Sequence, residues 1–161
     1  MGVTAVVGAT LAAGAYSAYQ QNESGKSAKK MHDFNAGIGE AQAVDALARG
    51  RKDEHDFRVQ GRGMIGTQRA SLAAQGVTLD DGSALEIQAD TGRQIELDAL
   101  TIRNNAAREA WGFRVGAADS RNRGSIARAE GRNQATATVL NTGASALGMG
   151  YSGYSGRKGA N

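Results

Sequence analysis

The chain has no proline in 161 residues, and this absence constrains its fold more than any other feature. Proline marks turns and ends helices, so its absence favours a few long helices with few connections. Aromatic residues make up 5% of the chain, and alanine and glycine supply most of its apolar character. Such a chain builds helices but no thick globular core, so we expect long, thin helix contacts, many of them between chains.

One segment carries clear turn chemistry. Gly76 suits the left-handed position that ends a helix, and Asp80-Asp81-Gly82 is a turn signal. Ser83 and Glu86 form a capping box, in which each side chain satisfies a free backbone N–H at the start of a helix. These signals predict helices over residues 27–75 and 83–132, joined by a turn over residues 76–82.

The two predicted helices match in length, at about 75 Å each. A short turn between helices of equal length makes them antiparallel neighbours. The predicted fold class is therefore all-α: a long antiparallel helical hairpin with small-residue apolar terminal segments, assembling into an oligomeric ring. The predicted domains are residues 1–22, the hairpin over residues 23–132, and a partly flexible tail over residues 133–161.

The second helix carries apolar residues at intervals of three and four, which is typical of a packed helix face. A neighbouring stripe suits a second partner and contains Leu97, Leu100, Ala107, Trp111 and Val115. The residues predicted to pack between helices or chains are Leu85, Ala89, Gly92, Ile95, Ala99, Ile102, Ala106, Trp111 and Phe113, with Ala110 and Ala117 on the same stripe.

Both ends of the chain are uncharged, over residues 1–22 and 133–156, whereas nearly all charge lies between Glu23 and Arg132. No basic residue precedes the first apolar run, which disfavours a signal peptide. Small residues four apart suit close helix packing, in lipid or in a soluble complex, and both readings stay open. The residues predicted for membrane packing are Gly8, Ala12, Gly14, Ala18, Gly148 and Ser152.

Glycines interrupt both predicted helices. Each one costs about 1 kcal/mol relative to alanine in a helix interior, so a lone hairpin is marginal. We expect the helices to break near residues 37–39 and 61–66, and neighbours to pack onto other glycines. A closed ring of hairpins would cover these glycine-rich faces.

No pattern of catalytic, cofactor-binding or metal-binding residues is present, so we predict a non-enzyme without cofactors. The chain has no cysteine and two histidines, His32 and His55. Both begin a His-Asp-Phe tripeptide, but about 35 Å of helix separates them, so they cannot share one site. Five arginines are candidates for contact with DNA or with an acidic partner: Arg114, Arg121, Arg123, Arg128 and Arg132.

Two segments carry a resemblance to a known family. Residues 65–70 (Ile-Gly-Thr-Gln-Arg-Ala) lead through the turn to Gly82 and Ser83, and residues 102–109 (Ile-Arg-Asn-Asn-Ala-Ala-Arg-Glu) follow. This order resembles the smallest of the three internal virion proteins, also called core or DNA-ejection proteins, of short-tailed bacteriophages. The likeness covers roughly residues 35–120 and includes the layout of apolar start, charged helical middle and Gly/Ser/Ala-rich end.

The resemblance implies a role in genome delivery. Such proteins are stored inside the capsid around the portal, and after ejection they help to form a channel for DNA across the host envelope, here at the outer membrane. The implied partners are copies of the chain, the other core proteins, the portal protein, DNA and the outer membrane. A structural portal or core scaffold that never enters a membrane is the alternative, and a pore-forming toxin or holin-like protein is a third reading.

Overall fold

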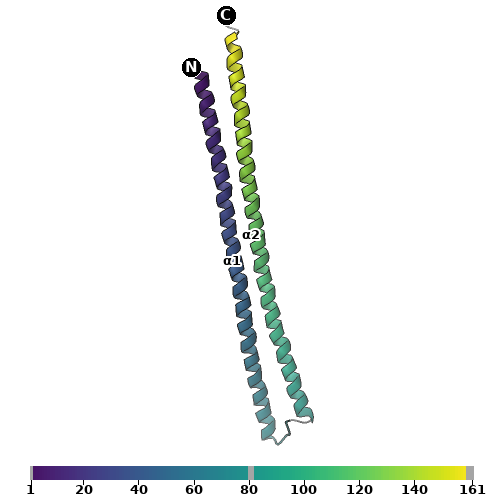
Figure 1. Cartoon of the computed structure of the whole chain (residues 1–161). Helices are drawn as coiled ribbons and strands as arrows, with labels where there is room; N and C mark the ends of the chain where they lie inside the picture. The colour runs from purple at the N-terminus through teal and green to yellow at the C-terminus, as the bar shows by residue number, and fades with distance from the viewer. Residues whose placement is uncertain (1, 80–81, 159–161) are drawn as a thin grey trace. The chain divides into compact units, whose positions relative to one another are not determined.

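The computed structural model describes residues 2–79 and 82–158, with side chains described for residues 5–79 and 82–148. The described residues form two helices and no strand: α1 covers Gly2–Ala74, and α2 covers Gly82–Lys158. Figure 1 shows α1 in purple to teal and α2 in teal to yellow, with one short connection between them. The all-α class predicted from the absence of proline is confirmed.

The helices are more continuous than the sequence predicted. The expected breaks near residues 37–39 and 61–66 are wrong, because α1 passes through both stretches as regular helix. Residues 23–30 and the described part of the predicted tail, residues 133–158, are helical as well. Gly39 lies against the backbone carbonyl of Phe113 and the methyl group of Ala117, and Gly61 lies against the Ile95 side chain. The contact between the helices therefore offsets the low helix propensity of glycine at these two positions.

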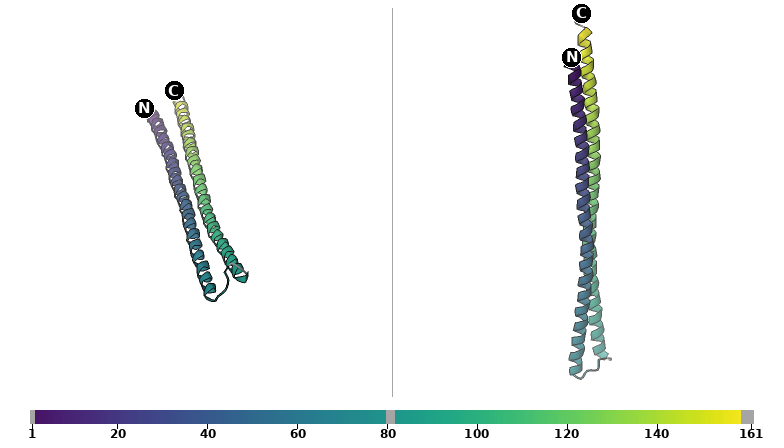
Figure 2. Two further views of the ribbon diagram at one scale, coloured as in Figure 1. Left: turned by 60° about the horizontal axis from the view of Figure 1, so that its bottom comes forward. Right: turned by 60° about the vertical axis from the view of Figure 1, so that its left-hand side comes forward.

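The chain divides into two compact units. The hairpin unit is Gly37–Ala117, and the terminal unit is Met1–Ala36 together with Ala118–Asn161. Within the hairpin unit, Gly50 faces Ala106 and Gly61 faces Ile95, so the two helices run antiparallel. Within the terminal unit, Gly14 faces Thr142 and Gly25 faces Gly131, again in antiparallel order. Figure 2 shows the two helix segments of each unit side by side in both views.

The end of α1 has the backbone geometry of a Schellman motif. The N–H of Val77 donates to the carbonyl of Leu72 at 3.1 Å, and the N–H of Gly76 donates to that of Ala73 at 3.0 Å. Gly76 has a φ of 75°, a left-handed conformation that glycine adopts without steric cost. These bonds satisfy carbonyls that would otherwise have no partner at the helix end, so Gly76 fixes where α1 stops.

The start of α2 differs from the predicted capping box. The helix begins at Gly82, which has a φ of 58°, so Ser83 lies within the first turn, beside Glu86 one turn on. Gln88 holds this end instead: its buried amide donates to the carbonyl of Leu79 at 3.1 Å and to that of Ala84 at 3.0 Å. The Gln88 side chain, in the second turn of α2, therefore links Leu79 in the connection to the start of the helix.

Candidate functional site

The inner face of the hairpin unit, where α1 and α2 meet, is built from the smallest side chains. Ala43, Ala46 and Ala110 form its buried cluster, with Leu47 and Phe113 packed against them. A Cβ on Gly50 would overlap the Cβ of Ala106, so the two helix backbones lie too close for a second methyl group. Because the helices come this near, buried positions are selected for small volume rather than for high hydrophobicity.

The inner face matches most of the stripe predicted on α2. Ala99, Ala106, Ala110 and Ala117 are buried. Gly92, Ile95, Ile102 and Phe113 are half-buried. Leu85 and Ala89 are exposed, because Ala84 and Gln88 occupy the inner positions one residue earlier.

Charged side chains flank the inner face of the hairpin unit. Arg58 donates to both carboxylate oxygens of Glu96 at 2.9 Å and to Glu54 at 2.7 Å. Hydrogen bonds to Glu96 first, and then to Glu54, raise the pKa of the Arg58 guanidinium, and the same bond to Arg58 lowers the pKa of the Glu96 carboxyl. On the opposite flank, Arg49 donates to Glu109 at 2.9 Å. These ion pairs fix which residues of α1 lie opposite which residues of α2. They add little to the free energy of folding, since exposed ion pairs contribute little to stability.

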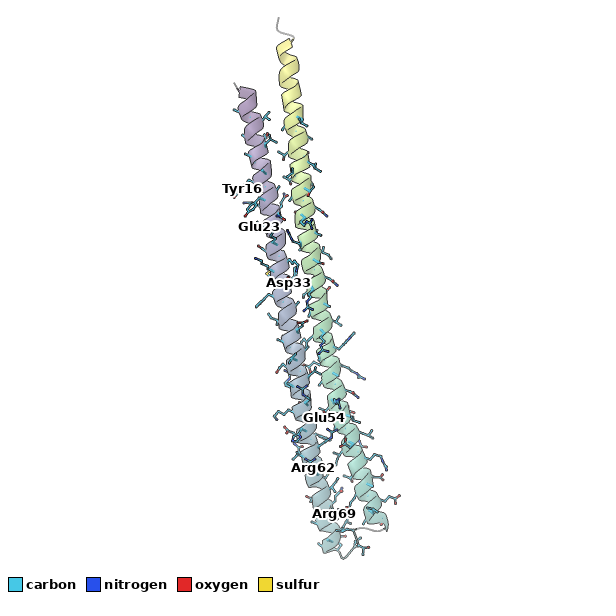
Figure 3. The ribbon with its side chains drawn as sticks, in the orientation of Figure 1. Tyr16, Glu23, Asp33, Glu54, Arg62 and Arg69 are labelled. Atoms are coloured by element: carbon cyan, nitrogen blue, oxygen red, sulfur yellow. The ribbon has the colours of Figure 1, made fainter. Side chains whose placement is uncertain are left out.

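Glu54 is a buried carboxylate that none of the sequence patterns above identified. It is 7% exposed, on the inner face of α1, and Figure 3 labels it there. Arg58 lies one turn further along α1 and supplies the cation that such a carboxylate needs. The Glu-Arg spacing of four residues, next to the alanines of the inner face, is the signal that indicates this pair in the sequence.

Across the helices of the terminal unit, the contacts include glycine backbone, a neutral hydroxyl–amide pair and one arginine that binds a neutral amide. A Cβ on Gly131 would lie 2.8 Å from the carbonyl oxygen of Gln21 and 2.9 Å from the Cα of Gly25. The hydroxyl of Thr138 donates to the Gln21 side chain at 2.9 Å, and Arg128 donates to the Oδ1 of Asn22 at 2.6 Å. The helix backbones are therefore in close contact at the pair of glycines.

The residues predicted for membrane packing have different surroundings. Gly14 and Ala18 are buried within the terminal unit, and a Cβ on Gly14 would overlap the Thr142 side chain. Gly8 and Gly148 have open space around the Cβ position, and Ala12 is exposed. Ser152 lies outside the residues whose side chains are described. Among the described residues, no helix combines the length and the apolar character needed to cross a bilayer.

The five arginines predicted for contact with DNA or a partner do not act as one group. Arg128 is held by Asn22 on α1, and Arg123 pairs with Asp119 at 2.9 Å on its own helix. Arg114, Arg121 and Arg132 are exposed. The contact prediction therefore applies to separate positions along α2 rather than to a single cluster.

In each His-Asp-Phe tripeptide the aspartate pairs with a lysine four residues earlier on α1. Asp33, labelled in Figure 3, accepts from Lys29 at 2.5 Å, and Asp56 accepts from Lys52 at 2.5 Å. The Lys52 hydrogen bond is the main reason that the pKa of Asp56 lies below its usual value. No group of three or more metal-binding side chains occurs among the described residues.

Large apolar side chains lie mainly on the outside of both units. Within the hairpin unit, α2 exposes Leu97, Leu100, Trp111 and Val115, which belong to the second stripe predicted on this helix. Trp111 is 69% exposed and is the single tryptophan of the chain. Comparison of the chain with family models, with curated proteins and with solved structures found no match.

Proposed function

We propose that this chain is an internal core protein of a short-tailed bacteriophage. It would be stored around the portal inside the virion, leave with the DNA at infection, and help to form a channel across the host envelope at the outer membrane. The resemblance of residues 65–70 and 102–109 to the smallest core proteins supports this assignment. In this role the protein acts by assembly, as a ring of copies together with the other core proteins, the portal protein and DNA, and has no catalytic activity.

The observation that carries the proposal is that small side chains are buried between the helices while large apolar side chains are exposed. Alanine and glycine fill the inner face of the hairpin unit, whereas leucine, valine and tryptophan are exposed on α2. Burial of a large apolar side chain is worth about 1.5–3 kcal/mol, so this surface favours contact with other chains. An exposed apolar surface is typical of a protein that contacts other chains.

The thin inner face also suits passage through a narrow phage tail. Its buried hydrophobic residues are alanines, each of which removes little apolar area from water. Unfolding a hairpin of this kind costs little, and its helices can form again from local contacts. Refolding after ejection would then depend on contacts between copies.

The alternative is a structural portal or core scaffold whose ends pack only on protein. Gly14 and Ala18 favour it, because both are already buried within the terminal unit. Small residues that have protein neighbours need no lipid to explain them.

Leakage of dye from vesicles made with outer-membrane lipids separates these two functions. The channel proposal expects purified protein to release the dye and expects Gly8→Glu to abolish release, since a charge is costly to insert in a membrane. Gly37→Glu is the matched control, because Gly8 and Gly37 both have open space around the Cβ position. Release that survives Gly8→Glu contradicts insertion of the N-terminal segment, and no release by the unaltered protein favours the scaffold.

Mass spectrometry of purified virions tests the assignment that both functions share. The protein should be present in intact particles and lost from particles whose DNA has been triggered to leave. Its absence from intact particles overturns both functions.

A further inference from the structure

One face of α2 in the hairpin unit is uncharged, apolar and open. Its residues recur at intervals of three and four and lie on the side of α2 away from the inner face: Leu97, Leu100, Asn104, Ala107, Trp111 and Val115. We call this set the outer face. Leu97 is 54% exposed and Val115 is 46% exposed, so the hairpin itself covers little of it.

The outer face contains a hollow beside its largest side chain. Asn104, Ala107, Arg108 and Trp111 line an open depression of about 410 Å³. Ala107 contributes a small side chain to this lining, and Trp111 contributes its indole. A depression of this kind can receive a leucine side chain from a second helix, as a knob enters a hole.

The outer face is complementary to itself when it is read in reverse. If two copies of α2 lie antiparallel, Leu97 meets Val115, Leu100 meets Trp111, and Asn104 meets Ala107. The midpoints of these three pairs lie within half a residue of one another, at Asn105 and Ala106, so a single two-fold axis accounts for all of them. We propose that two copies of this chain pair through the outer face of α2, antiparallel, with Leu100 of each copy seated beside Trp111 of the other.

The charges next to the outer face support this orientation. Glu96 and Arg114 lie on the same flank of α2 at equal distances from the midpoint, so each Glu96 meets Arg114 of the other copy. Glu96 is bonded to Arg58 but is still half exposed, and a carboxylate accepts more than two hydrogen bonds. Arg103 lies on this flank near the axis, where two copies repel each other weakly through solvent. Arg108, on the opposite flank, lies equally near the axis, so the antiparallel pair has two attractive pairs and two weak repulsions. A parallel pair would instead set Glu96, Arg103, Arg108 and Arg114 each against its own copy.

A parallel arrangement of the same two helices fits less well. It places Trp111 against Trp111 and leaves each Glu96 level with Glu96 of the other copy. Isologous two-fold pairs are also the commonest form of self-association. This antiparallel dimer is a different assembly from the ring proposed above. A ring whose copies all point in one direction contains no two-fold axis of this kind. The pair therefore stands or fails independently of any role in a virion.

Disulfide cross-linking tests the orientation directly, because the natural chain has no cysteine. Leu97→Cys mixed with Val115→Cys should give a cross-linked pair under mild oxidation. Leu97→Cys alone should give none, because the two copies of residue 97 would be about 27 Å apart along the antiparallel helices. Cross-linking of Leu97→Cys alone, or none in the mixture, overturns the antiparallel pair.

Sedimentation equilibrium tests whether the outer face is responsible. Val115→Ser should raise the dissociation constant of the pair about tenfold or more. Val59→Ser is the matched control, because Val59 and Val115 are both 46% exposed and Val59 lies on α1. Trp111 fluorescence supplies a second measurement: the emission should shift to longer wavelength on dilution in the unaltered protein. Equal weakening by both serine variants, or emission independent of concentration, overturns the proposal.

Discussion

Two contacts, one in each unit of the molecule, solve the same packing problem with different atoms. In the hairpin unit, Gly50 leaves room for a side chain, the methyl group of Ala106. In the terminal unit, Gly25 and Gly131 leave room for each other's backbone. Close packing of two helices can therefore depend on a side chain, which a substitution can replace, or on backbone atoms, which a substitution cannot remove.

The largest expected effect is that of Gly131→Ala in the terminal unit. The new Cβ meets the Gln21 carbonyl and the Gly25 Cα, and neither can move without separating the helices. Overpacking of this kind costs about 3 kcal/mol, and no smaller side chain nearby can relieve it. Hydrogen exchange should accelerate around residues 14–32, as measured by mass spectrometry. Unchanged exchange there would show that the two backbones are not in contact.

Gly50→Ala should have a smaller effect, and one that can be reversed. The clash is with the Ala106 methyl alone, so we expect a loss of about 1–2 kcal/mol in the free energy of unfolding. The double variant Gly50→Ala with Ala106→Gly exchanges the two side chains and should recover most of the loss in denaturant unfolding followed by circular dichroism. Additive destabilisation in the double variant would contradict this packing.

Glycines without a neighbour at the Cβ position should respond in the opposite direction. Gly112 in the hairpin unit and Gly143 in the terminal unit have open space around the Cβ position. Alanine at either position should raise the free energy of unfolding by about 1 kcal/mol, the difference in helix propensity. The same unfolding experiment measures both. A loss of stability at either position would reveal a neighbour that the described residues do not include.

The smallest expected effect is the response of the hairpin unit to acid. Arg58 lowers the pKa of Glu96, so this pair stabilises the folded state above the ordinary glutamate pKa, and the contribution disappears as pH falls below that range. Exchange around Glu96 should therefore accelerate as the pH falls, and the difference between neutral and acid pH is the quantity to measure. Glu96→Gln should remove the difference, and an unaltered difference would assign it to another group.

Much of the fold follows from the sequence, because its signals are local. The absence of proline, the turn chemistry at Gly76 and the alternation of small residues predict two helices with one connection. The glycine breaks were predicted wrongly. At Gly39 and Gly61 the covering atoms come from the other helix, whereas Gly37, Gly63 and Gly66 stay helical with open space around the Cβ position. The packing at Gly39 is visible only once Phe113 and Ala117 are placed beside it.

The candidate surfaces were harder to predict, because the most hydrophobic residues of this chain are not its most buried residues. Leu85 was expected to pack and is half exposed, whereas Ala84 beside it is buried. Where two helix backbones lie very close, only a small side chain fits between them. The larger neighbouring side chain therefore lies on the outside. The same reasoning explains why Trp111 lies on the surface.

Sedimentation velocity of the full chain over a wide range of concentration tests the central claim most directly. The claim is that small residues close the hairpin and leave its large apolar side chains to contacts between chains. We predict that the protein sediments as two or more chains at the higher concentrations, while circular dichroism shows high helix content. A single chain at every concentration, with the same helix content, would contradict it.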